Sequence, residues 1–298
     1  MKVDYHIHTR CSDGVCTVEE VLEKIRENQI ASFAISDHDT IAGLKRAREL
    51  CPKGSTFTTG LEITCAEFAV PGIEKKLSIH LLGYGFDEDD PDLNRLLDER
   101  GRRVENTFQN LMDELGRSGY PAGLSGVPIS CGVVLQLSDV LAYMKEKYAP
   151  LPGEIEELIL SWSRPLTESN ITLEQGIRAI HNAGGTTVWA HPFIVYREFK
   201  RQGLNAQEVE TVLKYLIEYG LDGMETDYLD FPETQRVQLR QMAERYGMMR
   251  SAGSDFHGSA ARGKMGVEIL SGLCSGNSRI RGTKNRGGRV CSGQRNTE

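Results

Sequence analysis

Val3-Asp4-Tyr5-His6-Ile7-His8, near the start of the chain, alternates strictly between apolar and polar side chains. Because alternate side chains of a β-strand share one face, the pattern predicts a strand with both histidines on its polar face. Thr17 and Glu20 then have the spacing of a capping box, and apolar side chains at helical spacing predict a helix over 17–28. Strand, loop and helix in this order form the first unit of a βα repeat.

The same order of elements returns along the chain. Further strands are predicted over 33–36, 57–63, 77–82, 187–190, 222–226 and 250–253. Further helices are predicted over 40–50, 172–183, 206–219 and 233–246. Seven strands that alternate with helices are typical of a parallel α/β fold. A chain of 298 residues is long enough for one α/β barrel with a large core.

One segment interrupts this alternation. Between about 91 and 172 no strand is predicted, and helices are predicted over 93–115, 137–147 and 154–162. We interpret 95–171 as a helical insertion that caps the site of a barrel built from 1–94 and 172–270. An independent domain is the alternative, but neither boundary has the flexible Gly, Ser and Pro composition of a linker.

Composition and charge exclude several classes of protein. The chain has 39% hydrophobic and 26% charged residues and no apolar run long enough for a membrane span. With no apolar leader at the N-terminus, we expect a cytoplasmic protein without a membrane partner. Seven cysteines without a C-x-x-C pair indicate reduced thiols rather than disulfides or a cysteine zinc site.

The net charge of −7 is unevenly distributed. Residues 271–298 contain six basic residues and one acidic residue, so this tail carries +5 and residues 1–270 carry −12. The tail is rich in Gly and Ser, and we expect it to be disordered; a nucleic-acid-binding arm is the alternative interpretation. A body this acidic is expected to repel long nucleic acids.

Histidines and carboxylates gather at or near the predicted strand ends. They are His6, His8, Asp13, Asp37, His38, Asp39, Glu62, His80, His191, Asp255 and His257. One such histidine would more often be structural, but six of the seven histidines fall in these places, and only His181 lies within a predicted helix. The carboxyl ends of the strands form the rim where α/β barrels build their sites. Imidazole and carboxylate groups are ligands for zinc, manganese and iron.

Six motifs in order resemble one family. They are His6-Ile7-His8-Thr9, Ser36-Asp37-His38, Gly60-Leu61-Glu62, His80-Leu81-Leu82-Gly83, Ala190-His191-Pro192 and Gly253-Ser254-Asp255-Phe256-His257. Together they resemble the PHP (polymerase and histidinol phosphatase) family, in particular phosphoesterases that act on nucleoside 3′,5′-bisphosphates and short RNA 5′ ends. The resemblance implies a distorted (β/α)7 TIM-like barrel with two or three divalent metal ions, Mn, Fe or Zn.

The resemblance also implies three sets of metal ligands. The first set is His6, His8, Glu62 and Asp255; the second is Asp13, His38 and His257; the third is Glu62, His80 and His191. Asp37 and Asp39 either support these ligands or cap the helix predicted over 40–50. Glu225 and Asp227 match no family ligand, and we expect them to hydrogen-bond to ligands or loops.

The expected activity is hydrolysis of phosphomonoesters of small nucleotides, or of short RNA 5′ ends, by metal-activated water. No nucleophilic side chain is needed, and the sequence has no Gly-x-Ser-x-Gly motif. The alternatives are a histidinol-phosphate phosphatase or other sugar or metabolite phosphatase, an amidohydrolase, and a metal-binding module without activity. The expected partner is a small phosphorylated substrate, with short RNA as a further candidate; the sequence does not indicate an oligomeric state.

Substrate contacts are harder to predict. Arg100 and Arg103 lie one helical turn apart and are candidates for binding a second phosphate, with a solvated helix face as the alternative. The Gly-Arg-Pro-His motif of many relatives is absent, and the chain reads Pro128-Ile129-Ser130-Cys131-Gly132 instead. The stretch from Gly258 to Lys264 has the spacing of a phosphate-binding P-loop, but Met265 replaces the required Ser or Thr. We therefore do not expect a nucleotide-binding loop there.

Overall fold

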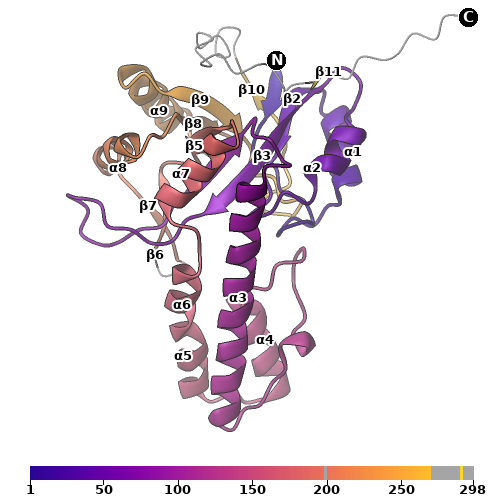
Figure 1. Cartoon of the computed structure of the whole chain (residues 1–298), viewed down its shortest axis with the longest axis vertical. Coiled ribbons are helices and arrows are strands. Elements are labelled where there is room, and N and C mark those ends of the chain that lie inside the picture. Colours follow the sequence, from indigo (N-terminus) through magenta and orange to yellow (C-terminus); the bar gives the residue numbers. More distant parts are fainter. Residues whose placement is uncertain (198–199, 270–288, 291–298) are drawn as a thin grey trace, which may run out of the picture.

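The computed structural model describes residues 1–197, 200–269 and 289–290, and its centre is a strongly curved sheet surrounded by helices (Figure 1). The strand order is β10-β1-β2-β3-β4-β5-β8-β9. The strands are β1 (Lys2–Asp4), β2 (Ile30–Ile35), β3 (Thr56–Thr64), β4 (His80–Tyr84), β5 (Thr186–Trp189), β8 (Gly223–Tyr228), β9 (Met249–Gly253) and β10 (Val267–Glu268).

The sheet nearly closes into a barrel where the first and last strands meet. The amide of Tyr5 donates to the carbonyl of Ala252 at 3.0 Å, and the amide of His8 donates to the carbonyl of Phe256 at 2.8 Å. Tyr5 and His8 follow β1, whereas Ala252 lies in β9 and Phe256 follows it, so these bonds bring the two segments side by side. The predicted barrel-like α/β class is confirmed.

The expectation of an all-parallel sheet is wrong at β4. This strand runs antiparallel to both β3 and β5, whereas β1–β2, β2–β3, β5–β8 and β8–β9 are parallel. A parallel connection needs a long crossover, usually a helix, and the 15 residues between β3 and β4 contain none. Because β4 is reversed, His80 at its first residue pairs with Thr64 at the last residue of β3. His80 therefore lies at the same rim as the carboxyl ends of the parallel strands.

The helices that cover the barrel begin and end close to their predicted limits. They are α1 (Val18–Glu27), α2 (Leu44–Glu49), α7 (Leu173–Asn182), α8 (Ala206–Glu218) and α9 (Glu233–Arg245). Thr17 and Glu20 form the predicted capping box at α1, and Thr172 with Gln175 forms another at α7. The helix predicted from 40 begins only at Leu44, because residues 40–43 form a turn and Gly43 provides no side-chain cap.

The helices bury one apolar face each against the sheet. Val18, Val21, Leu22 and Ile25 of α1 are all buried, and they join Phe33 and other strand residues in the main core. Full burial of one such aliphatic or aromatic side chain contributes about 1.5–3 kcal/mol relative to leaving it exposed. The strands that hold the polar rim residues are therefore fixed by a well-packed core.

The segment between β4 and α7 forms a helical projection (Figure 1). It contains α3 (Pro91–Arg117), a 3-10 turn η1 (Leu124–Gly126), α4 (Leu137–Lys147), α5 (Gly153–Ser161) and α6 (Ser163–Glu168). At 1.5 Å per residue, α3 is about 40 Å long. Its first turns place Leu93 and Leu97 in the barrel core, whereas Phe108 and Leu111 belong to a separate apolar cluster of the projection.

Two regions depart from the sequence expectations in other ways. A hairpin of β6 (Ile194–Arg197) and β7 (Lys200–Gly203) was not predicted, since the exposed Lys200 and Arg201 hide any alternation. The predicted tail over 271–298 lies outside the described residues, except for β11 (Arg289–Val290), which pairs with β3.

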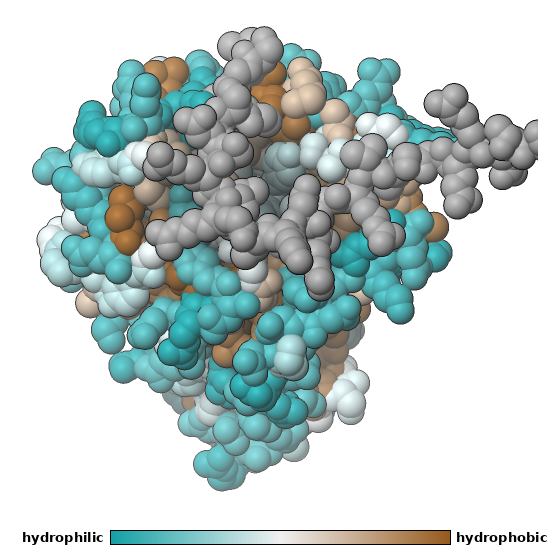
Figure 2. Space-filling view, turned by 45° about the horizontal axis from the view of Figure 1, so that its top comes forward, coloured by the Kyte–Doolittle hydropathy of each residue, from teal (hydrophilic) through white to brown (hydrophobic). Residues whose placement is uncertain are grey.

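One face of the molecule is mostly hydrophilic (Figure 2). Figure 2 shows a face on which hydrophilic residues predominate and hydrophobic ones form small separate groups. Among the described residues, none of the helices is both long enough and apolar enough to cross a membrane.

Candidate metal centre

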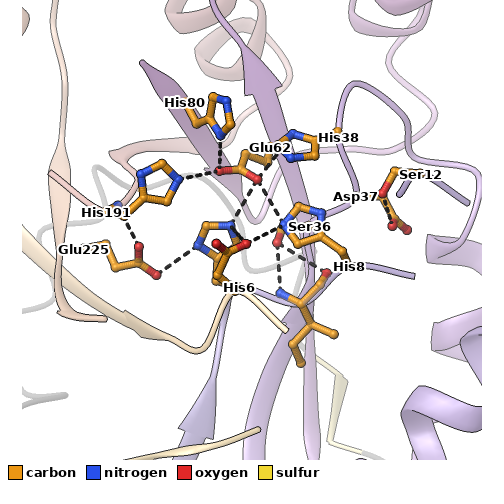
Figure 3. A network of polar contacts seen from close by, with 12 residues as sticks. His6, His8, Ser12, Ser36, Asp37, His38, Glu62, His80, His191 and Glu225 are labelled. Carbon is orange, nitrogen blue, oxygen red and sulfur yellow. Dashed lines mark hydrogen bonds and ion pairs between the residues drawn. The ribbon is translucent and has the colours of Figure 1, made fainter. Parts of the chain in front are cut away.

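The nine residues predicted as metal ligands converge at one rim of the barrel. Figure 3 shows His6, His8, His38, His80 and His191 arranged around Glu62. His6 and His8 follow β1, His38 follows β2, Glu62 lies in β3, His80 begins β4, and His191 follows β5. Asp13 lies in the loop before α1, and Asp255 and His257 follow β9. Seven segments far apart in the sequence therefore contribute to one site.

Glu62 lies at the centre of this cluster with a fully buried side chain. Its Oε2 is 3.1 Å from Nε2 of His6, 3.0 Å from Nε2 of His8 and 3.4 Å from Nδ1 of His38. Its Oε1 is 3.1 Å from Nδ1 of His80 and 3.4 Å from Nε2 of His191. A carboxylate whose two oxygens face five imidazoles has the placement of a bridging ligand.

The ligand atoms fall into three groups, each with its atoms within 4.8 Å of one another. The first group is His6, His8, Glu62 and Asp255, as in the predicted first set. The second contains the predicted Asp13, His38 and His257 together with His8. The third contains Glu62 and His80 with His38, whereas the prediction had His191 as the third member.

Several ligand atoms are buried without a hydrogen bond among the described residues. They are Nε2 of His6, both ring nitrogens of His8, Oε2 of Glu62 and Nδ1 of His191. A buried polar atom without a partner costs about 1–3 kcal/mol. Among these atoms, Nε2 of His6 and Nε2 of His8 lie 3.1 and 3.0 Å from Oε2 of Glu62 without hydrogen-bonding geometry, which is how ligands of a shared cation are arranged. The residues present therefore fit divalent ions.

The charges of these groups are strongly coupled. Burial alone would raise the pKa values of Glu62 and Asp255, but the surrounding histidines hold both well below their usual range. Burial lowers the pKa of His8, yet the carboxylates of Asp255 and Glu62 close to its ring raise it to about 10. Both carboxylates are thus ionised and available as ligands, and a cation must displace a proton from His8 to bind there.

Glu225 supports two of these histidines from behind. Its buried carboxylate lies 3.1 Å from Nδ1 of His6 and accepts the main-chain N–H of His191 at 2.7 Å. The contact with Nδ1 leaves Nε2 of His6 directed toward Glu62. Carboxylates in this position orient histidine ligands and raise their basicity. The expectation that Glu225 hydrogen-bonds to ligands is confirmed; Asp227 instead pairs with Arg240.

Asp37 and Asp39 hold loops of the site, and neither caps α2. Asp37 accepts the amide of Thr9 at 2.6 Å and the hydroxyl groups of Thr9 and Ser12 at 2.7 Å, which fixes the loop that carries Asp13. Asp39 accepts the amide of Thr64 at 3.0 Å and pairs with Arg100. The capping alternative for these two residues is therefore wrong.

Backbone strain concentrates at the same rim. Asp39, His191 and Asp255 have φ values of 54°, 32° and 54°, although none is a glycine. Such conformations cost of order 1–3 kcal/mol each and persist where the surroundings fix them. His191 is therefore not extended, although a proline follows it.

The predicted substrate-binding arginines lie at the base of the projection. Arg100 contacts Asp39 at 3.0 Å and also donates to the side-chain oxygen of Asn170. Arg103 donates to the carbonyl of Ser169 at 3.0 Å. Both arginines thus connect α3 to the barrel or to the end of the projection, and their role in substrate binding stays a prediction. His181 lies outside the cluster and pairs with Asp222 at 2.7 Å, as its structural interpretation required.

The sequence did not indicate the third arginine near the cluster. Nη1 of Arg262 is 3.2 Å from Oδ2 of Asp255. The same oxygen accepts the hydroxyl group of Tyr228 at 3.0 Å. Arg262 lies inside the P-loop-like stretch. Its short distance in sequence from His257 was the one feature that could have indicated a place near the cluster.

A barrel-like α/β sheet with histidines and carboxylates gathered at one rim is the architecture of a metal-dependent hydrolase. Comparison with family models identifies residues 4–112 as a PHP domain. With this match over residues 4–112 and the site described above, the chain is a hydrolase of phosphate esters that depends on metal ions.

Its relatives include enzymes of related chemistry. It is 27% identical to the 5′-3′ exoribonuclease Rnm of Escherichia coli over 85% of this chain and 84% of that protein. It is 28% identical to the phosphoribosyl 1,2-cyclic phosphate 1,2-diphosphodiesterase of Eggerthella lenta over 87% and 95%. It is 25% identical to the 3′,5′-nucleoside bisphosphate phosphatase of Chromobacterium violaceum over 91% and 93%.

A solved structure supports the same assignment. The crystal structure of a protein from Bifidobacterium adolescentis, described as a metal-dependent phosphoesterase, matches with a TM-score of 0.55 and 25% identity. The match covers 88% of each chain.

Proposed function

We propose that this chain hydrolyses phosphomonoesters of small nucleotides, such as nucleoside 3′,5′-bisphosphates, or acts on short RNA 5′ ends. The observation that carries the proposal is the buried cluster in which Glu62 faces five histidines while Asp13 and Asp255 flank them. The exoribonuclease and the bisphosphate phosphatase among the relatives support a nucleotide-related substrate.

The nine ligand candidates would hold two or three divalent ions of Mn, Fe or Zn. Such ions lower the pKa of water and neutralise the charge that develops on phosphate oxygens. The chain itself provides the orientation: Glu225 fixes the ring of His6, and Asp37 fixes the loop that carries Asp13. Strained backbone at His191 and Asp255 turns both side chains into the cluster.

Covalent catalysis by a cysteine is disfavoured for four of the five thiols that the structure describes. Burial raises the pKa values of Cys11, Cys16, Cys65 and Cys131, so each stays a thiol near neutral pH. A reaction that uses water as the nucleophile is consistent with this arrangement.

The first test uses variants of the cluster. We expect Asp255→Ala and His191→Ala each to reduce hydrolysis of a nucleoside 3′,5′-bisphosphate to background while the circular dichroism spectrum stays unchanged. His181→Ala is the matched control, because His181 pairs with Asp222 away from the cluster, and this variant should keep full turnover. Full turnover in both cluster variants would refute the proposed site.

A substrate panel separates the proposal from its alternatives. The panel contains a nucleoside 3′,5′-bisphosphate, a short 5′-phosphorylated RNA, histidinol phosphate and phosphoribosyl 1,2-cyclic phosphate. We expect the highest kcat/KM for one of the first two compounds. The Eggerthella lenta relative makes the cyclic phosphate a specific second candidate. A clear preference for either of the last two compounds would overturn the nucleotide assignment.

A further inference from the structure

The segment after β9 forms a tight turn that places Arg262 beside the metal centre. The amides of His257 and Gly258 both donate to the carbonyl of Arg262, at 2.9 and 3.1 Å. The amide of Arg262 donates to the hydroxyl oxygen of Ser259 at 3.2 Å. The turn is also joined to the rim, since the amide of Val15 donates to the carbonyl of His257 at 2.9 Å. The backbone of Arg262 is therefore fixed relative to the ligand candidate His257.

Gly258 makes this turn possible. Its φ is +74°, and a Cβ there would lie 2.6 Å from Sγ of Cys16 and 2.8 Å from a methyl carbon of Val15. Glycine at this position lets the turn lie directly on the loop that carries Asp13. The spacing that resembles a P-loop thus serves another purpose, which is to direct the side chain of Arg262 to the rim.

The guanidinium group makes contacts on one side only. Nη1 is 3.2 Å from Oδ2 of Asp255 and 3.4–3.5 Å from the ring nitrogens of His257. Within the described part of the chain, Nε and Nη2 make no hydrogen bond. The side chain is 30% exposed, so solvent has access to the arginine.

The carboxylate of Asp255 lies between Arg262 and the histidine ligand candidates. Its Oδ1 faces Nε2 of His8 at 3.3 Å and Nε2 of His6 at 3.5 Å, whereas its Oδ2 faces Arg262. A cation bound at Oδ1 and the guanidinium group would thus be neighbours across one carboxylate. A tetrahedral phosphoryl group with one oxygen directed at the cations has further oxygens to direct at Nε and Nη2. Arginine binds phosphate by such paired N–H donors.

We propose that Arg262 is a substrate-binding residue that donates from Nε and Nη2 to the non-bridging oxygens of the phosphoryl group to be hydrolysed. This inference rests on the proposed function and adds the residue that recognises the phosphate. It also explains a positive side chain that is held close to a cluster of cation ligands. The competing explanation is structural, in which Arg262 only balances the charge of Asp255.

The test compares Arg262→Lys and Arg262→Ala with a matched control, Arg236→Lys. Arg236 is similarly half-buried, but its guanidinium donates to the carbonyls of Phe231 and Leu229, away from the cluster. All proteins are loaded with Mn²⁺, and the metal content, the affinity for inorganic phosphate by calorimetry, and kcat and KM are measured.

We expect both Arg262 variants to bind inorganic phosphate at least about tenfold more weakly, with unchanged metal content and an unchanged melting temperature. Lysine should not restore binding, because it lacks the planar pair of donors. The control should bind phosphate as the unaltered protein does. Unchanged phosphate affinity in both Arg262 variants would overturn the inference, and so would a loss of metal that accounts for the weaker binding.

The two proposals fail in different ways. If the unaltered protein turns over none of the nucleotide substrates but phosphate affinity still depends on Arg262, the substrate assignment fails and the role of Arg262 holds. If nucleotides are hydrolysed and phosphate affinity is the same in both Arg262 variants, the role of Arg262 fails and the substrate assignment holds.

Discussion

Individual side chains of the metal centre differ in how directly they act. Glu62 contacts five histidines, whereas Glu225 lies behind His6 and acts on the cluster through that ring. Sequence patterns identified the first kind of residue, because ligands recur in short motifs at strand ends. They gave Glu225 a supporting role without naming His6 as its partner, and they gave Arg262 no role, because the partner of Glu225 is distant in the sequence and Arg262 lies in a turn.

A substitution of Glu225 tests its positioning role. We expect Glu225→Gln to lower Mn²⁺ affinity by about 10- to 100-fold, because a neutral amide orients His6 less firmly and makes it less basic. The measurement is a competition titration with a chelator, together with kcat and KM. Glu244→Gln, on the exposed side of α9, is the control and should bind metal normally. Equal metal affinity in both variants would show that Glu225 is only a packing residue.

Whole elements bring these side chains together through the direction of the strands. The helices α1, α4 and α9 lie within one or two residues of their predictions, because capping residues and apolar spacing are local signals. The reversal of β4 was not predictable from such signals, since an apolar strand reads the same in either direction. Its consequence is functional, because only this direction places His80 beside Glu62.

The loop between η1 and α4 connects the helical projection to the metal centre. The amide of Val133 donates to the carbonyl of Ser12 at 2.9 Å, one residue before Asp13. Gly132 has a φ of +62°, and a Cβ there would lie 1.8 Å from the same carbonyl oxygen. Only glycine permits this contact between the loop and the segment that carries Asp13.

A substitution of Gly132 tests whether this contact matters for catalysis. We expect Gly132→Ala to lower kcat/KM by about 10- to 100-fold. The added methyl group would displace the loop and with it Ser12 and Asp13, and small displacements of site residues slow a reaction strongly. The barrel core is untouched, so the melting temperature should change little. Gly123→Ala is the control, since a Cβ at that position meets open space. Normal kcat/KM in the Gly132 variant would mean that the projection does not control the site.

The whole molecule combines a curved sheet, a core beneath the rim and a helical projection beside it. Composition and charge indicated an ordinary globular protein. They did not predict where the projection lies, because no sequence pattern reports the angle at which a helix leaves a barrel. The limits 95–171 stay predictions, as does the exclusion of long nucleic acids by the acidic body. The fold was predictable in outline because predicted strands and helices alternate along the chain, and the site because six of the seven histidines lie at or near predicted strand ends.

The central claim is that hydrolysis depends on divalent ions held by this cluster. The most direct measurement is turnover of a nucleoside 3′,5′-bisphosphate before chelation, after chelation, and after addition of Mn²⁺, with elemental analysis of the protein at each stage. The account predicts two or three bound ions per chain, loss of turnover when they are removed, and its return when Mn²⁺ is added. Full turnover by protein that elemental analysis shows to be free of metal would contradict it.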